Sequence, residues 1–165
     1  MADLRNSVDN VKWTRDEEMH ITLKFLGDMD NRDLLVVGEE LRRIASQIEA
    51  FTATLSGIGT FPRGKPPRIV WAGIEQGSEQ LIAMYEQLDE SLVQLGVPRE
   101  GRAYTPHLTL GRVGRGADLE RLQKHLQRVE GGMQGTFDVN EVILYASLRE
   151  RGKLVYEPID RCELA

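Results

Sequence analysis

The sequence predicts an α+β fold with two lobes, and three observations support this prediction. Apolar residues alternate between strand-like and helix-like spacing along the chain. The word His20-Ile-Thr-Leu occurs a second time as His107-Leu-Thr-Leu. From His20 to Phe51 is 31 positions, and the matching interval from His107 to Phe137 is 30. We therefore expect two pseudo-symmetric lobes that place the motif strands face to face across a groove. In each lobe a helix would cover the apolar face of the sheet.

The bulk composition is that of one ordinary domain, residues 1–165. Its net charge of −5 argues against a protein that coats long nucleic acids. The single cysteine, Cys162, excludes a disulfide framework and favours a reducing compartment. No signal peptide and no run long enough to span a membrane is visible in the sequence. We expect a cytoplasmic protein with no membrane partner.

The first half contains four expected elements after a short polar start. A strand at residues 20–26 is followed by a helix that Asn31 caps, with apolar residues spaced three and four apart. A strand at residues 51–58 and a loop at residues 59–67, rich in Gly, Pro and basic residues, come next. A strand at residues 69–74 completes this half.

The second half repeats the alternation. Ser78 is expected to cap a helix that runs to Leu95, and a loop at residues 96–106 follows. The remaining expected elements are a strand at 107–113, a helix at 119–129, one or two strands within 137–148, and a last strand at 154–159.

The repeat is uneven at its start. A strand and a full helix precede the second motif, whereas only 19 residues precede His20. We therefore expect the first lobe to lack its opening strand and helix. A missing strand would leave a sheet edge through which the chain could form a homo-oligomer.

The repeated word brings together the residue types of acid–base catalysis. Side chains two apart in a strand share a face, so His20, Thr22 and Lys24 would form a polar face. Imidazole gives or takes a proton near neutral pH, and a threonine hydroxyl donates a hydrogen bond. One copy alone is typical of an ordinary strand. Two copies, each opening a strand, favour a site for one small anion.

The two motifs resemble those of a known family. His20-Ile-Thr-Leu-Lys-Phe-Leu-Gly and Pro106-His-Leu-Thr-Leu-Gly-Arg112 are similar to the His-x-Thr signatures of two-histidine phosphoesterases. The likeness is greatest to the RNA 2',3'-cyclic phosphodiesterases, also called 2'-5' RNA ligases. The further segments that carry it are Phe61-Pro62-Arg63, Arg68-Ile-Val-Trp71 and Val142-Ile-Leu-Tyr145.

The resemblance implies a bilobal fold in which two antiparallel sheets face a central, water-filled groove, with helices outside. It implies hydrolysis of RNA 2',3'-cyclic phosphate ends to 2'-phosphomonoesters without a metal or other cofactor. Some family members also join RNA ends through a 2'-5' linkage in vitro.

By resemblance, His20 is the proton donor to the leaving 3' oxygen and His107 is the proton acceptor from water. Pseudo-symmetry leaves the reverse assignment open. Thr22 and Thr109 would hydrogen-bond the non-bridging phosphate oxygens as charge develops there. Because the reaction needs one neutral and one protonated imidazole, we expect a bell-shaped dependence of rate on pH.

Three further residues are candidates for substrate binding: Arg68, Arg112 and Tyr104. Strand alternation puts Arg112 on the face opposite His107, unless a bulge near Gly111 turns it back. Tyr104 or Phe61 could stack on a base, although core packing is the expected role of Phe61. The cations expected to be solvated surface charges are Arg63, Lys65 and Arg115. We expect His125 to lie on a helix surface.

Three alternatives remain open from the sequence. The same site could act on a cyclic nucleotide, ADP-ribose cyclic phosphate or a 2'-5' oligonucleotide. A metal hydrolase could use both histidines, although no third ligand stands at metal spacing. A binding module could hold phosphorylated RNA ends without turnover.

Overall fold

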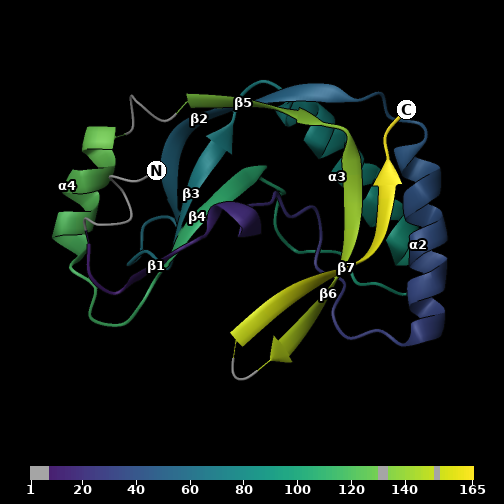
Figure 1. The fold of residues 1–165 in the computed structure, drawn as a ribbon, viewed down its shortest axis with the longest axis horizontal. Helices are drawn as coiled ribbons and strands as arrows, with labels where there is room; N and C mark the ends of the chain where they lie inside the picture. The colour runs from purple at the N-terminus through teal and green to yellow at the C-terminus, as the bar shows by residue number, and fades with distance from the viewer. Residues whose placement is uncertain (1–7, 130–133, 151–152) are drawn as a thin grey trace. The chain divides into compact units, whose positions relative to one another are not determined.

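The computed structural model describes residues 8–129, 134–150 and 153–165 (Figure 1). Its elements in chain order are β1 (Val11–Trp13), the 3-10 helix η1 (Asp16–Glu18), α2 (Asn31–Ala45), β2 (Phe51–Phe61), β3 (Ile69–Ile74), α3 (Ser78–Gln94), β4 (His107–Val113), α4 (Leu119–Val129), β5 (Gln134–Val139), β6 (Glu141–Glu150) and β7 (Lys153–Glu163). The α+β class is therefore confirmed, with one curled antiparallel sheet and a second, smaller sheet.

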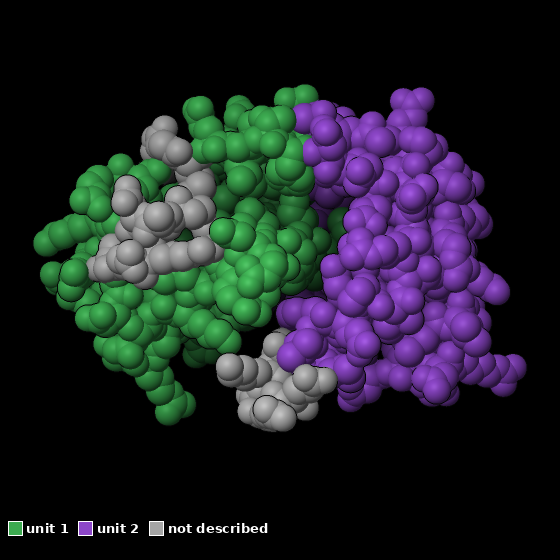
Figure 2. Space-filling view, viewed as in Figure 1, with its two compact units in different colours: residues 1–23, 53–78, 105–137 green, residues 24–52, 79–104, 138–165 purple. Residues whose placement is uncertain are grey.

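The chain divides into two compact units, which Figure 2 shows in different colours. Unit 1 contains residues 1–23, 53–78 and 105–137, and unit 2 contains residues 24–52, 79–104 and 138–165. Each unit is therefore assembled from segments that are distant in the sequence.

Unit 1 is built on a five-stranded sheet of order β1-β4-β3-β2-β5. The β1–β4, β4–β3 and β3–β2 pairs are all antiparallel. One face of this sheet buries an apolar cluster that includes Leu122 of α4, and its other buried members are Val8, Val70, Ala72 and Leu110. Because side chains alternate along a strand, the opposite face carries Trp71 and Thr109.

Unit 2 combines α2 and α3 with the antiparallel β6–β7 pair. The C-terminal residue Ala165 exchanges backbone hydrogen bonds with Ile48 and Ala50, which ties the chain end to the segment after α2. A buried ion pair joins Lys24 Nζ to Asp89 Oδ1 of α3 at 2.5 Å, and Lys24 also donates to the Pro98 carbonyl. This pair anchors the end of the first motif segment in unit 2.

Most predicted elements have the expected bounds. The ranges of β3, β4 and α4 agree with prediction, and β2 and β7 are longer than expected. α2 begins at Asn31, but its cap is Asp30, whose Oδ1 accepts from the backbone N–H groups of Arg32 and Asp33. Ser78 is the first residue of α3 rather than its cap. The short strand β1 was not predicted.

The predicted strand at residues 20–26 is wrong. This segment forms only one isolated bridge, between Ile21 and Leu108. The alternating pattern is present, but a strand also needs a neighbour along its whole length, and beyond Ile21 the structure gives it none among the described residues.

The prediction that the motifs belong to different lobes is also wrong. Both motif words lie in unit 1, and their segments meet at the Ile21–Leu108 bridge. The internal repeat of the sequence therefore does not divide the molecule into its two units.

None of the helices that the structure describes is long and apolar enough to cross a bilayer.

Candidate active site

The two motif segments run antiparallel beside each other in unit 1. Ile21 pairs with Leu108 in the isolated bridge. In an antiparallel pair, the residues flanking a bridge oppose each other in reverse order. His20 is therefore opposite Thr109. Thr22 is likewise opposite His107, so each histidine stands across from the threonine of the other motif.

All four residues share one face of the sheet. Leu108 packs against the buried apolar cluster, and Leu110 belongs to it. The alternate residues of β4, His107 and Thr109, therefore project from the other face. The bridge places His20 and Thr22 on that same side. We call it the motif face, and it holds the four predicted catalytic residues.

The same backbone contact orients both imidazoles. His20 Nδ1 lies 2.8 Å from the Glu18 carbonyl oxygen, and His107 Nδ1 lies 2.7 Å from the Thr105 carbonyl oxygen. A carbonyl only accepts, so Nδ1 carries the hydrogen in both rings. Nε2 is then the atom of each ring that gives or takes a proton. Both rings are therefore held in the same way, through Nδ1 and a backbone carbonyl two residues earlier.

Two aromatic rings pack beside His107. Phe61 meets the imidazole edge-on with a centroid distance of 5.2 Å, and Trp71 lies 6.1 Å from it. Gly59 lets the indole lie against β2, because a methyl group there would overlap the Trp71 ring. The expected core role of Phe61 is therefore wrong, since the apolar cluster lies on the other side of the sheet.

A bulge brings Arg112 to the motif face, as the sequence allowed. The register shifts between Val70 and Trp71, so that Trp71 pairs with Thr109 while Ile69 pairs with Arg112. Ile69 and Trp71 are two apart on β3 and share a face. Arg112 therefore lies on the same face as Thr109, and its side chain is exposed.

Comparisons with known proteins identify the family. Residues 1–151 match the model of the 2'-5' RNA ligase superfamily. The chain belongs to this superfamily. It is 31% identical over 163 residues to an RNA 2',3'-cyclic phosphodiesterase of Aeropyrum pernix, covering 96% of this chain and 92% of that protein. A Methanocaldococcus jannaschii protein of the same name is 32% identical, covering 90% of this chain and 82% of that protein.

A solved superfamily structure has the same fold. The crystal structure of Escherichia coli LigT complexed with 3'-AMP matches with a TM-score of 0.73 and 25% identity. The match covers 99% of this chain and 92% of that chain. The fold class that the sequence predicts is thus shared with a superfamily member crystallised with a nucleotide.

The other two substrate-binding candidates belong to different units, Arg68 to unit 1 and Tyr104 to unit 2. Arg68 is in unit 1 and exposed, and its backbone bonds to Phe61 and Val113 hold the start of β3. Tyr104 belongs to unit 2, where its ring stacks on Tyr85 at a centroid distance of 4.5 Å. Burial raises the pKa of the Tyr104 phenol, with a further contribution from Tyr85, so the hydroxyl stays neutral.

Two more predictions concern charged side chains. Arg63, Lys65 and Arg115 are exposed, as expected for solvated charges. His125 is buried, with 7% of its surface exposed, so its expected surface position is wrong. Leu122, one turn earlier on α4, enters the core and draws His125 with it. Arg128 donates to His125 Nδ1 at 3.0 Å, which requires a neutral ring.

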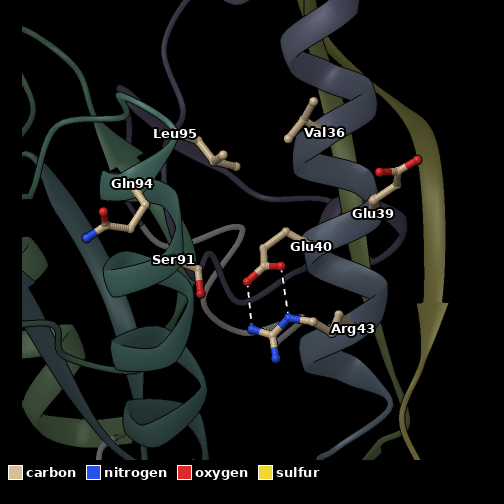
Figure 3. Close-up of a pocket in the computed structure, with 7 residues that line it drawn as sticks. All are labelled: Val36, Glu39, Glu40, Arg43, Ser91, Gln94 and Leu95. Atoms are coloured by element: carbon tan, nitrogen blue, oxygen red, sulfur yellow. Dashed lines mark hydrogen bonds and ion pairs between the residues drawn. The ribbon is translucent and has the colours of Figure 1, made fainter.

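A cavity of about 470 Å³ lies between α2 and α3 in unit 2 and contains none of the predicted site residues (Figure 3). Glu40 and Arg43 both line the cavity and form an ion pair with each other. Hydrogen bonds from Arg43 and then Ser91 lower the pKa of the Glu40 carboxyl to about 2.

Among the described residues, no three His, Cys, Asp or Glu side chains gather as a metal site would require.

Proposed function

We propose that this protein hydrolyses 2',3'-cyclic phosphodiester ends of RNA to 2'-phosphomonoesters by two-histidine acid–base catalysis. One observation carries the proposal. Two imidazoles with identically held Nδ1 atoms share a sheet face with two threonines, each histidine opposite the other motif's threonine. Membership of a superfamily whose relatives are named RNA 2',3'-cyclic phosphodiesterases supports it.

In the proposed step, neutral His107 accepts a proton at Nε2 from the attacking water. The water oxygen bonds to phosphorus and the bond from phosphorus to the 3' oxygen breaks. Protonated His20 gives its Nε2 proton to that leaving oxygen. Thr22 and Thr109 donate hydrogen bonds to the non-bridging oxygens, where negative charge increases. The product is a 2'-phosphomonoester beside a free 3' hydroxyl.

The residues on the motif face can supply both proton transfers without a metal or another cofactor. The same two transfers would occur when a 5' hydroxyl replaces water: His107 accepts the proton of that hydroxyl, its oxygen bonds to phosphorus, and the bond to the 3' oxygen breaks as His20 protonates it. The product would be a 2'-5' linkage, which would account for 2'-5' RNA ligase activity in vitro. We also propose a cytoplasmic location, which the single buried cysteine, Cys162, supports. Arg68 and Tyr104 stay candidates for substrate binding.

A direct test uses an RNA ending in a 2',3'-cyclic phosphate, incubated with the protein in excess EDTA. We expect a 2'-phosphate end, identified by chromatography against both isomeric standards. A 3'-phosphate product would contradict the assignment of the leaving oxygen. Loss of activity on chelation would favour a metal hydrolase instead. Binding of the RNA with no turnover would favour the binding-module alternative.

Self-association through a sheet edge belongs to the same proposal. In the described part of unit 2, β6 and β7 pair only with each other as strands, so one edge of each has no strand partner there. β7 contains Pro158, which cannot donate to a further strand, whereas the ten residues of β6 include no proline. We propose β6 as the edge that pairs with a second copy.

A further inference from the structure

Three aromatic rings, those of Phe61, Trp71 and His107, form one cluster on the motif face, and all three side chains are half-buried. The Phe61 and His107 rings lie 5.2 Å apart between centroids and are nearly perpendicular, at 82°. The indole of Trp71 lies 6.1 Å from the imidazole and 5.1 Å from the Phe61 ring. All three distances fall in the range of favourable aromatic contacts. Trp71 therefore packs against both the imidazole and the ring beside it.

Two glycines leave space for the indole. Gly59 of β2 is the cross-strand partner of Trp71, and a methyl group there would overlap the indole ring. Gly73, two residues after Trp71 on β3, is the cross-strand partner of His107. A methyl group at Gly73 would lie 2.7 Å from the Ser56 carbonyl oxygen and 3.5 Å from Trp71 Cζ3. Directly opposed residues share a face of the sheet, so the indole lies over Gly59 and alongside Gly73, next to the imidazole.

Packing holds the indole in place. Trp71 Nε1 is buried and makes no hydrogen bond to any described residue. The ring is therefore fixed by its contacts with Phe61 and with the backbone at Gly59. A substitution of Trp71 by another aromatic residue then removes no hydrogen bond that the structure shows, and its effects report on the ring contacts alone.

The imidazole of His107 needs a support besides its hydrogen bond. The bond between Nδ1 and the Thr105 carbonyl fixes one atom of the ring. The terminal torsion of a histidine is broad and roughly two-fold, and a half turn would move Nε2 to the place of Cε1. One hydrogen bond favours the oriented ring by only about fivefold. The rings of Phe61 and Trp71 stand beside the imidazole and restrict this rotation.

We propose that Trp71 is a positioning residue that, with Phe61, fixes the plane of the His107 imidazole and so directs Nε2 for proton transfer. This inference rests on the proposed function, in which His107 exchanges the proton, and deepens it by naming what holds that ring. The two supports act differently: the Nδ1 hydrogen bond selects the tautomer, and the aromatic rings select the plane.

The kinetic test measures kcat and KM of Trp71 variants on an RNA ending in a 2',3'-cyclic phosphate. Trp71→Leu should lower kcat about 10- to 100-fold and leave KM largely unchanged, because a misplaced Nε2 slows proton transfer rather than binding. Trp71→Phe should recover most of this loss, since it keeps an aromatic ring beside the imidazole. A raised KM with unchanged kcat would make Trp71 a contact of the RNA base and overturn the inference. No change in either constant would have the same consequence.

Trp13→Leu is the matched control. Trp13 is the other tryptophan of the chain and packs against the buried apolar cluster on the other side of the same sheet. Its loss should lower stability and leave kcat unchanged, at a temperature where circular dichroism shows both variants folded. An equal fall of kcat in Trp13→Leu and Trp71→Leu would mean a general packing effect and overturn the inference.

Gly59→Ala tests the placement of the indole with all three rings present. The methyl group should displace the indole and lower kcat. Because Gly59 acts through the indole, adding Gly59→Ala to Trp71→Leu should cause no further fall. Unchanged kcat in Gly59→Ala, or a full additional loss in the double variant, would contradict the proposed support.

A second measurement does not need turnover. The nuclear magnetic resonance signals of the two imidazole nitrogens show which one carries the hydrogen, and their loss in His107→Asn assigns them. The Nδ1–H tautomer of neutral His107 should predominate in the unaltered protein, and the Nε2–H tautomer should gain population in Trp71→Leu. An unchanged tautomer in Trp71→Leu would overturn the inference even if kcat falls. If the unaltered protein does not hydrolyse the RNA, the proposed function fails, and the inference falls with it.

Discussion

At the residue scale, the orientation of the two imidazoles is determined by the chain immediately before them. Each Nδ1 bonds to the carbonyl two residues earlier, at Glu18 and at Thr105. Because this hydrogen bond is made to a residue only two positions away, the orientation of each ring does not depend on a carboxylate from a distant part of the chain. Its chemical consequence is that Nε2 is the atom through which either ring could exchange a proton.

The substitution His107→Asn tests proton transfer separately from the hydrogen bond that orients the side chain. The asparagine amide can still donate to the Thr105 carbonyl, but it has no group that accepts and returns a proton. We expect kcat to fall by about 10² to 10⁴ on a cyclic-phosphate RNA, with affinity for the RNA end largely kept. Single-turnover kinetics and fluorescence anisotropy measure the two quantities. Unchanged kcat would exclude His107 from the chemistry.

The pH profile of the same variant assigns the two roles. A general base acts only when deprotonated, so it produces the acidic limb of the bell-shaped profile, and the general acid produces the alkaline limb. If His107 is the base, its loss should remove the acidic limb from the residual rate. Removal of the alkaline limb would reverse the roles of His20 and His107.

The sequence could predict that the His and Thr of each motif share a face, because residues two apart on either side of a bridged residue lie on the same side. It could not predict that Arg112 and Lys12 would lie together, because a bulge and the β1–β4 register decide this. The prediction that His125 is exposed was wrong because the helical period gives the direction of the buried face of α4 but not its width.

At the element scale, the segment after His20 shows how a motif can be held without a strand ladder. Beyond the bridge at Ile21, its anchor is Lys24, whose side chain is 2% exposed and paired with Asp89 of α3. The alternation in the sequence marked Lys24 as part of a polar face. The alternation of polar and apolar residues predicts a strand but does not show whether a neighbouring strand is present to pair with it. The strands β3 and β4 have such partners, and their bounds agree with prediction.

Lys24→Met should destabilise the protein by about 3 kcal/mol, because it leaves Asp89 buried without its main partner. Chemical denaturation monitored by circular dichroism measures the loss. The double variant Lys24→Met, Asp89→Leu should recover most of it, since no charge is then left buried. Arg99→Met removes only the exposed partner of Asp89, at 3.3 Å, and should cost less than about 1 kcal/mol. Equal losses in Lys24→Met and Arg99→Met would contradict the anchoring role.

At the scale of the whole molecule, units and sequence repeats do not coincide. The chain passes between the units several times, and both motif words fall in unit 1. The periodicity of the sequence was sufficient to predict the fold class and the succession of most elements. It could not predict the grouping into units, because grouping depends on contacts between distant segments.

Self-association through β6 is testable at this scale. Multi-angle light scattering should show a mass that rises with concentration from 18.6 kDa toward twice that value. Leu148→Lys should hold the mass at that of the monomer, because charges on an edge strand oppose pairing. Leu148 is 41% exposed on β6. Leu119→Lys, on α4 and 37% exposed, is the control. A constant monomer mass in the unaltered protein would exclude the edge contact.

The two faces of β4 also predict that the effect of a substitution depends on its position along the strand with a regular period. In a scan of every position from His107 to Val113, damage to turnover and damage to stability should alternate with a period of two. That alternation should slip by one position at Leu110-Gly111, where the register shifts. This shift of one position in the pattern of substitution effects would reveal the bulge in a growth-based selection, independently of the structure.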